Sequence, residues 1–388
     1  MAIINRMAEL HDEITAWRRA YHTNPELMYD VHDTAGHVAE KLRAFGCDEV
    51  VTGIGRTGVV GVIRGSHPGN KVIGLRADMD ALPITEETGL PYASRNIGKM
   101  HACGHDGHTA MLLGAAQYLA ETRNFAGTAV VIFQPAEEGG AGGEAMVQDG
   151  MMERFGIEEV YGLHNMPGLE VGKFAICEGP IMASTDEFTI TIKGRGSHAA
   201  MPHQGIDPIV TGAQLVNALQ TIPSRNVHPL EGLVVSITQF HAGNTNNVIP
   251  ETAMINGTIR ALSDETRKLA EARLRSMVGM VTQMAGATYE MDFHVGYPVT
   301  VNNDEATRKA VEAAKLVAGE NGVDPQVRAT LGGEDFSYML NARPGAYIFM
   351  GNGDTAGLHH PAYDFNDEAI PHGTSYWAKL VESLMPAA

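Results

Sequence analysis

The sequence predicts an α/β protein of two domains: a larger one with a mainly parallel sheet and helices on both faces, and a smaller α+β domain inserted into it. Three observations support this prediction. At 388 residues the chain exceeds what one hydrophobic core usually serves. Strands, several of them continuously apolar, alternate with helices over the first half of the chain. Near residue 184 the pattern changes to strands in which polar and apolar residues alternate.

The first half of the chain begins with two expected helices. Apolar residues at helical spacing between Ile3 and Trp17 predict a surface helix over the first 22 residues, and 33–46 is a second helix capped by Gly46. The elements expected after these are strands at 48–52, 58–65, 70–82, 127–135 and 158–167, and helices at 107–122 and 142–155.

A self-contained stretch of about 110 residues follows, in the order β-α-β-β-α-β of ferredoxin-like domains. Its expected strands are 186–194, 233–243, 252–262 and 288–296, and its helices are 206–222 and 264–286. From about 296 the chain returns to helix and buried strand, at 305–322 and 346–351, and it closes with a helix at 367–384. We therefore expect a discontinuous domain of residues 1–183 and 296–388 that encloses a domain of residues 184–295.

Composition excludes several classes of function. The formal net charge of −18 argues against nucleic-acid and anionic-membrane partners, because both need a basic surface. The three cysteines are few and far apart, which argues for a reducing compartment. The N-terminal stretch lacks the apolar run of a signal peptide, and no segment approaches the ~18 apolar residues of a membrane span. We expect a cytoplasmic enzyme.

One motif resembles a nucleotide site in its letters only. "GIGRTG" at 53–58 matches G-x-G-x-x-G, but a dinucleotide fingerprint must open a helix, and here the strand-like "VVGVIRG" follows. We interpret it as a hairpin turn.

The stretch "HACGHDGH" at 101–108 gathers three histidines, a cysteine and an aspartate. Cys103 and His105 lie two apart in a loop that precedes an expected helix, so their side chains can converge on one point. Thiolate and imidazole together suit borderline divalent metals. This loop is the first part of a predicted metal site.

Further donors follow expected strands. Glu137 and Glu138 follow the strand 127–135, His164 follows the strand residues "VYGL" at 160–163, and His359 and His360 follow the strand 346–351. The carboxyl ends of parallel strands are where ligands bind in open sheets. Neighbouring side chains on a turn point in different directions, so one glutamate could bind metal while the other faces a substrate. We expect these donors to meet the 101–108 loop.

Eight ordered motifs then resemble a known family. They are "RADMDALPI", "MHACGHDGHTAMLLGAA", "FQPAEEGGAGGEAM", "GLHNMP", "GRGSHAAMPHQGIDP", "NVIPETAMINGTIRAL", "GGEDFSYM" and "LHHPAYDFND". Together they resemble the M20 metallopeptidase clan, and within it the amidohydrolase subfamily of hippurate hydrolases, N-acyl-amino-acid amidohydrolases and plant auxin-conjugate hydrolases. The resemblance implies a catalytic domain that binds two divalent ions (Mn, Zn, Co or Ni) and a ferredoxin-like lid used for dimerisation.

The resemblance also assigns roles to single residues. The residues similar to the family's metal ligands are Cys103, His105, Glu138, His164 and His359. Glu137 resembles the general base. His359 is chosen over His360 because the family's histidine follows the leucine of "LH-x-P". Asp78 and Asp80 occupy the place where other branches of the clan have a metal-binding histidine and its orienting aspartate, so at most they support the ligands.

Residues of the expected lid resemble substrate-contacting groups. His198 resembles the histidine that steadies the oxyanion, which in dimeric members comes from the partner's lid. Asn247 and Arg260 resemble residues that hold the substrate's α-carboxylate, for which a planar guanidinium is well suited.

The implied function is a metal-dependent hydrolase that cleaves N-acyl-L-amino acids to a carboxylic acid and a free amino acid. Metal-bound hydroxide would be the nucleophile, and Glu137 would take the water's proton and deliver it to the leaving amine. Its partners would be a small-molecule substrate and further copies of the chain, in a homodimer or homotetramer formed through the lid. The alternatives are a dipeptidase or other small-amide hydrolase of the same clan, an amidase with Cys103 as nucleophile, and a non-catalytic binding protein on a hydrolase fold.

Overall fold

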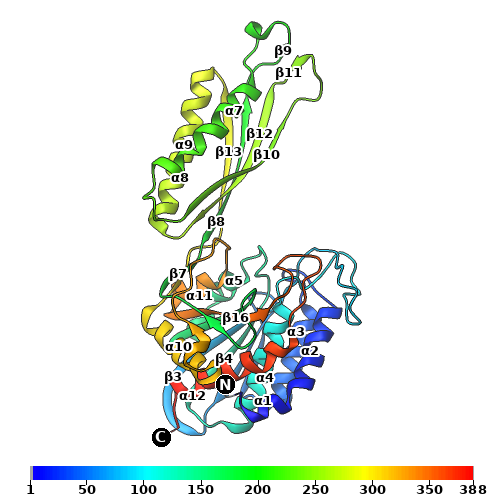
Figure 1. Ribbon diagram of the computed structural model, residues 1–388, viewed down its shortest axis with the longest axis vertical. Coiled ribbons are helices and arrows are strands. Elements are labelled where there is room, and N and C mark those ends of the chain that lie inside the picture. Colours follow the sequence, from blue (N-terminus) through cyan, green and yellow to red (C-terminus); the bar gives the residue numbers. More distant parts are fainter. Residues whose placement is uncertain (1–2, 388) are drawn as a thin grey trace. The chain divides into compact units, whose positions relative to one another are not determined.

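The computed structural model describes residues 3–387, which form two compact units (Figure 1). The large unit comprises the described chain up to Ile181, Val301–Arg328 and the described chain from Asp335 onward. The small unit comprises Met182–Thr300 and Ala329–Glu334.

The large unit is built on an eight-stranded sheet in the order β1-β2-β4-β3-β5-β16-β6-β15. These strands are β1 (Glu49–Ile54), β2 (Gly58–Arg64), β3 (His67–Asp78), β4 (Ala126–Gln134), β5 (Glu159–Pro167), β6 (Phe174–Ala175), β15 (Val323–Asp324) and β16 (Gly345–Gly353). The four central strands β4, β3, β5 and β16 are mutually parallel. Their carboxyl ends therefore share one edge, and the predicted donors follow three of these strands.

The antiparallel strands lie toward the margins of this sheet. β1 pairs with β2, and β2 pairs with β4, both antiparallel. The residues 53–58 join β1 to β2 as a turn, with Gly53 and Gly55 in the left-handed region at φ 85° and 57°. The hairpin interpretation of "GIGRTG" is confirmed, and no helix opens there.

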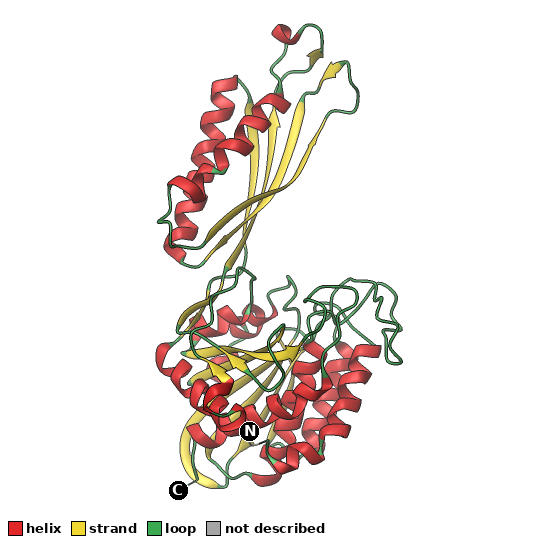
Figure 2. Cartoon of the chain, viewed as in Figure 1, coloured by secondary structure: helices red, strands yellow, loops and turns green. Residues whose placement is uncertain are grey.

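Helices lie on both faces of the large sheet (Figure 2). They are α1 (Asn5–Glu9), α2 (His11–Thr23), α3 (His32–Ala44), α4 (His105–Thr122), α5 (Gly142–Gln148), α6 (Met151–Arg154), α10 (Asp304–Ala318), α11 (Phe336–Ala342) and α12 (Ile370–Leu384), with 3-10 turns at Glu320–Gly322 and Asp367–Ala369. α4 is buried from His105 to Ala116, because it packs against the sheet and between α2 and α12. This burial explains its unbroken apolar run from Ala110 to Ala116.

Two of the expected helices are each divided in two. The helix expected over the first 22 residues is α1 and α2, which meet at Leu10; its residues 1 and 2 lie outside the described chain. The helix expected at 142–155 is α5 and α6. Gly150 adopts φ 77° between them, a conformation that ends a helix turn and that glycine adopts readily.

The small unit has the split βαβ order that the sequence predicts. Its sheet order is β10-β12-β8-β13, with every neighbouring pair antiparallel. The elements are β8 (Ser184–Lys193), α7 (Pro208–Leu219), α8 (Thr221–Arg225), β10 (Leu233–Ala242), β12 (Thr252–Ala261), α9 (Asp264–Ala285) and β13 (Thr288–Val295). The short pieces are β9 (Ser197–His198), a 3-10 turn at Pro202–Gln204 and β11 (Val248–Ile249), with β7 (Gly179–Met182) and β14 (Thr300–Asn302) where the chain passes between the units.

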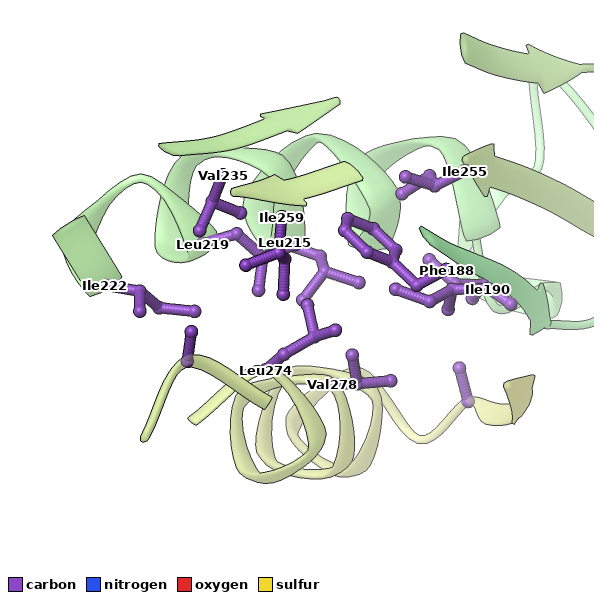
Figure 3. Close-up of a cluster of buried hydrophobic side chains, with 13 residues drawn as sticks. Phe188, Ile190, Leu215, Leu219, Ile222, Val235, Ile255, Ile259, Leu274 and Val278 are labelled. Carbon is purple, nitrogen blue, oxygen red and sulfur yellow. The ribbon is translucent and has the colours of Figure 1, made fainter. Parts of the chain in front are cut away.

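One apolar core holds the small unit together (Figure 3). Strand residues such as Phe188, Ile190 and Ile259 meet Leu215 of α7 and Leu274 of α9, all of them essentially inaccessible to water. Alternate residues of β8 and β12 are buried, as expected for a sheet covered by helices on one face only.

Within residues 3–387, none of the helices combines the length and apolarity that crossing a membrane would require.

Candidate metal centre

The 101–108 loop brings Cys103 and His105 to the amino end of α4. Gly104 between them adopts φ 90°, and a Cβ there would lie 2.2 Å from Asn165 Nδ2, so the turn requires glycine. The Cys103 Sγ lies 3.4 Å from His164 Nε2 at the end of β5. The loop and the end of β5 are therefore in direct contact, as the sequence predicts.

The two glutamates lie on the loop that follows β4. Their backbone amides point to one carboxylate: Asp80 Oδ1 accepts from Glu137 N at 2.9 Å, and Asp80 Oδ2 accepts from Glu138 N at 3.1 Å. Ala136 precedes them at φ 54°, a strained conformation for a residue with a Cβ. Asp80, which follows β3, therefore fixes the backbone at both glutamates and with it the directions of their side chains.

The predicted donors fall into three linked groups, in each of which the potential ligand atoms lie within 4.8 Å of one another. These groups are Cys103 with His105 and His164, Cys103 with Glu138 and His359, and His105 with Glu137 and Glu138. Cys103, His105 and Glu138 each belong to two of the groups. The structure thus brings together all five predicted ligands and the predicted base.

The imidazole rings are oriented for metal binding. Since a backbone carbonyl can only accept, His105 Nδ1 donates to Asp80 O at 2.8 Å and His164 Nδ1 donates to Asn165 O at 2.6 Å. This leaves each Nε2 with its lone pair toward the cluster.

Two buried polar atoms of the cluster show whether its residues are suited to hold a metal ion. Among the residues that the structure describes, His105 Nε2 and Glu138 Oε1 are buried and have no hydrogen-bond partner. An unsatisfied buried polar atom costs about 1–3 kcal/mol. Divalent metals accept this combination of nitrogen, oxygen and sulfur donors and would satisfy both atoms. The donor set therefore fits divalent ions.

His359 and His360 differ in position. His359 Nε2 lies 3.4 Å from Glu138 Oε1, and its backbone adopts φ 63° while its N–H donates to Ala102 O at 2.7 Å. His360 Nδ1 instead accepts from Ala362 N at 3.0 Å, and within the described chain His360 belongs to none of the potential metal groups. The geometry favours His359.

A buried hydrogen-bonded chain supports the cluster, and the sequence reasoning missed most of it. His108 Nδ1 donates to Asp78 Oδ1 at 2.7 Å, and His108 Nε2 accepts from Asn165 N at 3.0 Å. Asn165 Nδ2 donates to Cys103 O at 2.6 Å, and Asn165 Oδ1 accepts from the Tyr363 hydroxyl at 2.7 Å. The signal lay in the quoted motifs, since His108, Asn165 and Tyr363 are each within five positions of a predicted ligand and Asp78 is part of "RADMDALPI".

The protonation of the cluster bears on the alternative with Cys103 as nucleophile. Burial and the neighbouring Glu138 raise the pKa of the Cys103 thiol. Burial and His108 lower the pKa of His164 far below its usual value. Nucleophilic cysteines depend on a lowered thiol pKa beside a cationic group. A raised thiol pKa is the opposite of this requirement, so this alternative is not favoured.

The predicted substrate-contacting residues lie in the small unit. His198 on β9 pairs with Val248 on β11, so His198 and Asn247 are neighbours, and both are exposed. Arg260 lies near the end of β12, eight residues beyond Thr252, which is about 26 Å in an extended strand. Within one chain, therefore, Arg260 is not brought together with His198 and Asn247.

Sulfur, nitrogen and oxygen donors gathered beyond the carboxyl ends of parallel strands define the class: a metalloprotein with an α/β scaffold. Residues 74–383 match peptidase family M20/M25/M40. The chain belongs to this family.

Relatives extend over nearly the whole chain. The hippurate hydrolase of Campylobacter jejuni is 44% identical over 380 residues, which cover 98% of each chain. The N-acyl-L-amino acid amidohydrolase of Geobacillus stearothermophilus is 46% identical over 299 residues, covering 76% of this chain and 80% of that one. Among solved structures, the YxeP protein of Bacillus subtilis, described as a dinuclear metal binding peptidase of the M20 family, superposes with a TM-score of 0.85 at 34% identity and covers 98% of this chain and 100% of its own.

Proposed function

We propose that this protein is a metal-dependent amidohydrolase that cleaves N-acyl-L-amino acids into a carboxylic acid and a free amino acid. The observation that carries the proposal is the cluster of Cys103, His105, Glu138, His164 and His359, with Glu137 in the same group as two of its members. The similarity to a hippurate hydrolase and to an N-acyl-L-amino acid amidohydrolase supports this class of substrate.

In this proposal the five clustered donors hold two divalent ions (Mn, Zn, Co or Ni). When bound, the ions supply a lowered pKa for a coordinated water and polarise the carbonyl of the scissile amide. Glu137 is only 7% exposed and lies beside Glu138 on the loop fixed by Asp80. Its carboxylate takes the proton of the attacking water and returns it to the leaving nitrogen.

The small unit would serve as lid and dimerisation domain. Its expected boundaries are 184–295, with the catalytic domain formed by 1–183 and 296–388. Asn247 and Arg260 lie toward opposite ends of the small unit, so one substrate carboxylate can contact both only if they come from two chains. We therefore propose a homodimer or a larger assembly of dimers, in which His198 and Asn247 of one subunit complete the site of another.

Metal removal and reconstitution test the function. The protein is stripped with a chelator, reloaded separately with Mn, Zn, Co and Ni, and assayed on N-benzoyl and N-acetyl derivatives of several amino acids, with dipeptides as the comparison. We expect no turnover after chelation, recovery on reloading, and faster cleavage of N-acyl amino acids than of dipeptides. A preference for dipeptides would favour a dipeptidase of the same clan.

Two further results would contradict the proposal. Activity that survives complete chelation would favour a cysteine nucleophile. Metal-loaded protein that turns over none of the substrates would favour a binding protein. Light scattering or sedimentation on the same preparation reports the oligomeric state.

A further inference from the structure

A buried cation lies between three carboxylates in the large unit. The Arg18 side chain, on α2, is fully buried. Its Nη1 lies 3.5 Å from Asp106 Oδ2 and 3.2 Å from Asp364 Oδ1, and its Nη2 lies 2.6 Å from Asp367 Oδ1. A buried arginine that meets several carboxylates is a fixed junction rather than a solvated surface charge.

The carboxylates belong to the two segments that carry distant members of the metal cluster. Asp106 follows His105 directly in the first turn of α4. Asp364 and Asp367 follow His359 by five and eight residues. One guanidinium therefore ties the segment of His105 to the segment of His359, although these histidines are separated by more than half of the chain.

Two aromatic residues complete the junction. The Tyr92 hydroxyl donates to Asp364 Oδ2 at 2.7 Å, and the Arg18 Cζ lies 4.7 Å from the centre of the Tyr92 ring. On the other side, His22 Nδ1 pairs with Asp106 Oδ2 at 2.8 Å. The orientations of Asp106 and Asp364 are therefore each set by at least two donors.

His359 depends on such an anchor. Its side chain is 53% exposed, and its backbone is held in a strained left-handed conformation. A residue in that state keeps its place only when the surrounding segment is constrained, and the Asp364 and Asp367 contacts supply that constraint on its carboxyl side.

We propose that Arg18 is a positioning residue of the metal centre, whose buried guanidinium holds the His359 segment in register with the His105 segment so that both histidines reach the metal ions. The inference rests on the proposed function in one respect, the role of these histidines as ligands. A guanidinium presents several donors in a planar fork, whereas an ammonium is a compact charge on a flexible stem. Lysine at this position cannot meet three carboxylates in the same geometry.

The neighbouring Arg19 offers a matched control. It also pairs with Asp367, at 2.8 Å, and its Cζ lies 4.5 Å from the Tyr92 ring. Its side chain is 46% exposed, and no contact of Arg19 with Asp106 or Asp364 occurs in the described chain. Arg18→Lys and Arg19→Lys therefore make the same chemical change on adjacent residues, only one of which joins the two segments.

Cobalt binding is the direct test. Metal-free protein is titrated with Co²⁺, and the visible absorption of the metal and its thiolate band is followed. In Arg18→Lys we expect one binding step to weaken about tenfold or more, because lysine cannot keep the hydrogen bonds to all of the buried carboxylates. Arg19→Lys should bind within twofold of the wild type. Tyr92→Phe, which removes a single hydroxyl from Asp364, should weaken the same step about fivefold.

The outcomes separate a positioning role from a general structural one. If Arg18→Lys lowers the melting temperature but binds cobalt as the wild type does, the proposal is overturned. If Arg18→Lys does not fold, Tyr92→Phe decides: wild-type cobalt binding in that variant overturns the proposal, and weakened binding supports it.

Amide hydrogen exchange keeps this inference distinct from the proposed function. If the wild type binds no divalent ion, the proposed function fails, and exchange in residues 354–366 then reports on the junction alone. Faster exchange there in Arg18→Lys but not in Arg19→Lys supports the junction. Equal exchange in the two variants overturns it.

Discussion

Asp80 offers the sharpest test of how the site is built, because one carboxylate positions both glutamates. Its two oxygens accept from the amides of Glu137 and Glu138 at 2.9 and 3.1 Å. In Asp80→Asn one oxygen remains an acceptor, and the other becomes an NH₂ group that faces an N–H. The substitution therefore removes one hydrogen bond to a charged group, which contributes about 1.5–3 kcal/mol.

Because each 1.4 kcal/mol corresponds to a factor of ten, kcat/KM should fall roughly 10- to 150-fold if the loss appears in the positions of the two glutamates. The assay is hydrolysis of an N-acyl amino acid at saturating metal, with the free energy of unfolding measured by urea on the same samples. Asp149→Asn is the control, since Asp149 Oδ2 accepts from Gly55 N at 2.7 Å on another loop. We expect it to lower stability and to leave kcat/KM within twofold.

The reasoning is refuted if Asp80→Asn loses stability as expected and yet keeps its kcat/KM within twofold. In that case the hydrogen bonds would stabilise the loop without determining where its glutamates point.

Three further predictions concern catalysis, pH and packing. Glu137→Gln should lower kcat by about 10²–10⁴-fold with unchanged metal content by elemental analysis, and loss of metal instead would assign Glu137 to the ligands. Burial alone would lower the pKa of His22, but hydrogen bonds to Asp106 and Glu86 raise it to about 9. Because this folded-state pKa exceeds the unfolded value near 6.5, protonated His22 stabilises the folded protein fully below pH 6.5, and this contribution is lost as the pH rises through 9. Urea unfolding should then show the difference between wild type and His22→Gln shrinking by about 3 kcal/mol from pH 6.5 to 9.5, and a constant difference would contradict it. Leu274→Ala should cost about 2–5 kcal/mol of unfolding free energy, whereas the exposed neighbour Arg273→Ala should cost under about 0.5; equal effects would refute the packing of Figure 3.

Much of the fold could be predicted because the spacing of apolar residues along the chain matches the side of each strand or helix that is buried. Alternation over 186–194 predicted a half-exposed strand, and the burial of β8 follows it residue by residue. The helices at 1–22 and 142–155 were predicted as single elements, because hydrophobic periodicity continues across Leu10 and Gly150. Where a helix breaks depends on the backbone conformation at one residue, which periodicity does not contain.

For the metal centre, the sequence could predict which residues come together but not how their side chains are oriented. Donors that follow parallel strands lie at one edge of the sheet, so Glu138, His164 and His359 could be expected in advance to meet Cys103 in the loop before α4. The orientation of each imidazole could not, because it depends on carbonyls such as Asp80 O and Asn165 O that only the folded chain places.

By itself the sequence determined the alternation of strands and helices, the split order of the small unit and the chemical identity of the donors, because these depend on residue type and spacing along the chain. Only the tertiary structure brought His359 to Glu138, placed Asp80 under both glutamates and buried Arg18 between segments more than 250 residues apart. Such contacts depend on how distant segments pack against each other, and a guanidinium or carboxylate acquires its partners only when that packing excludes water around it.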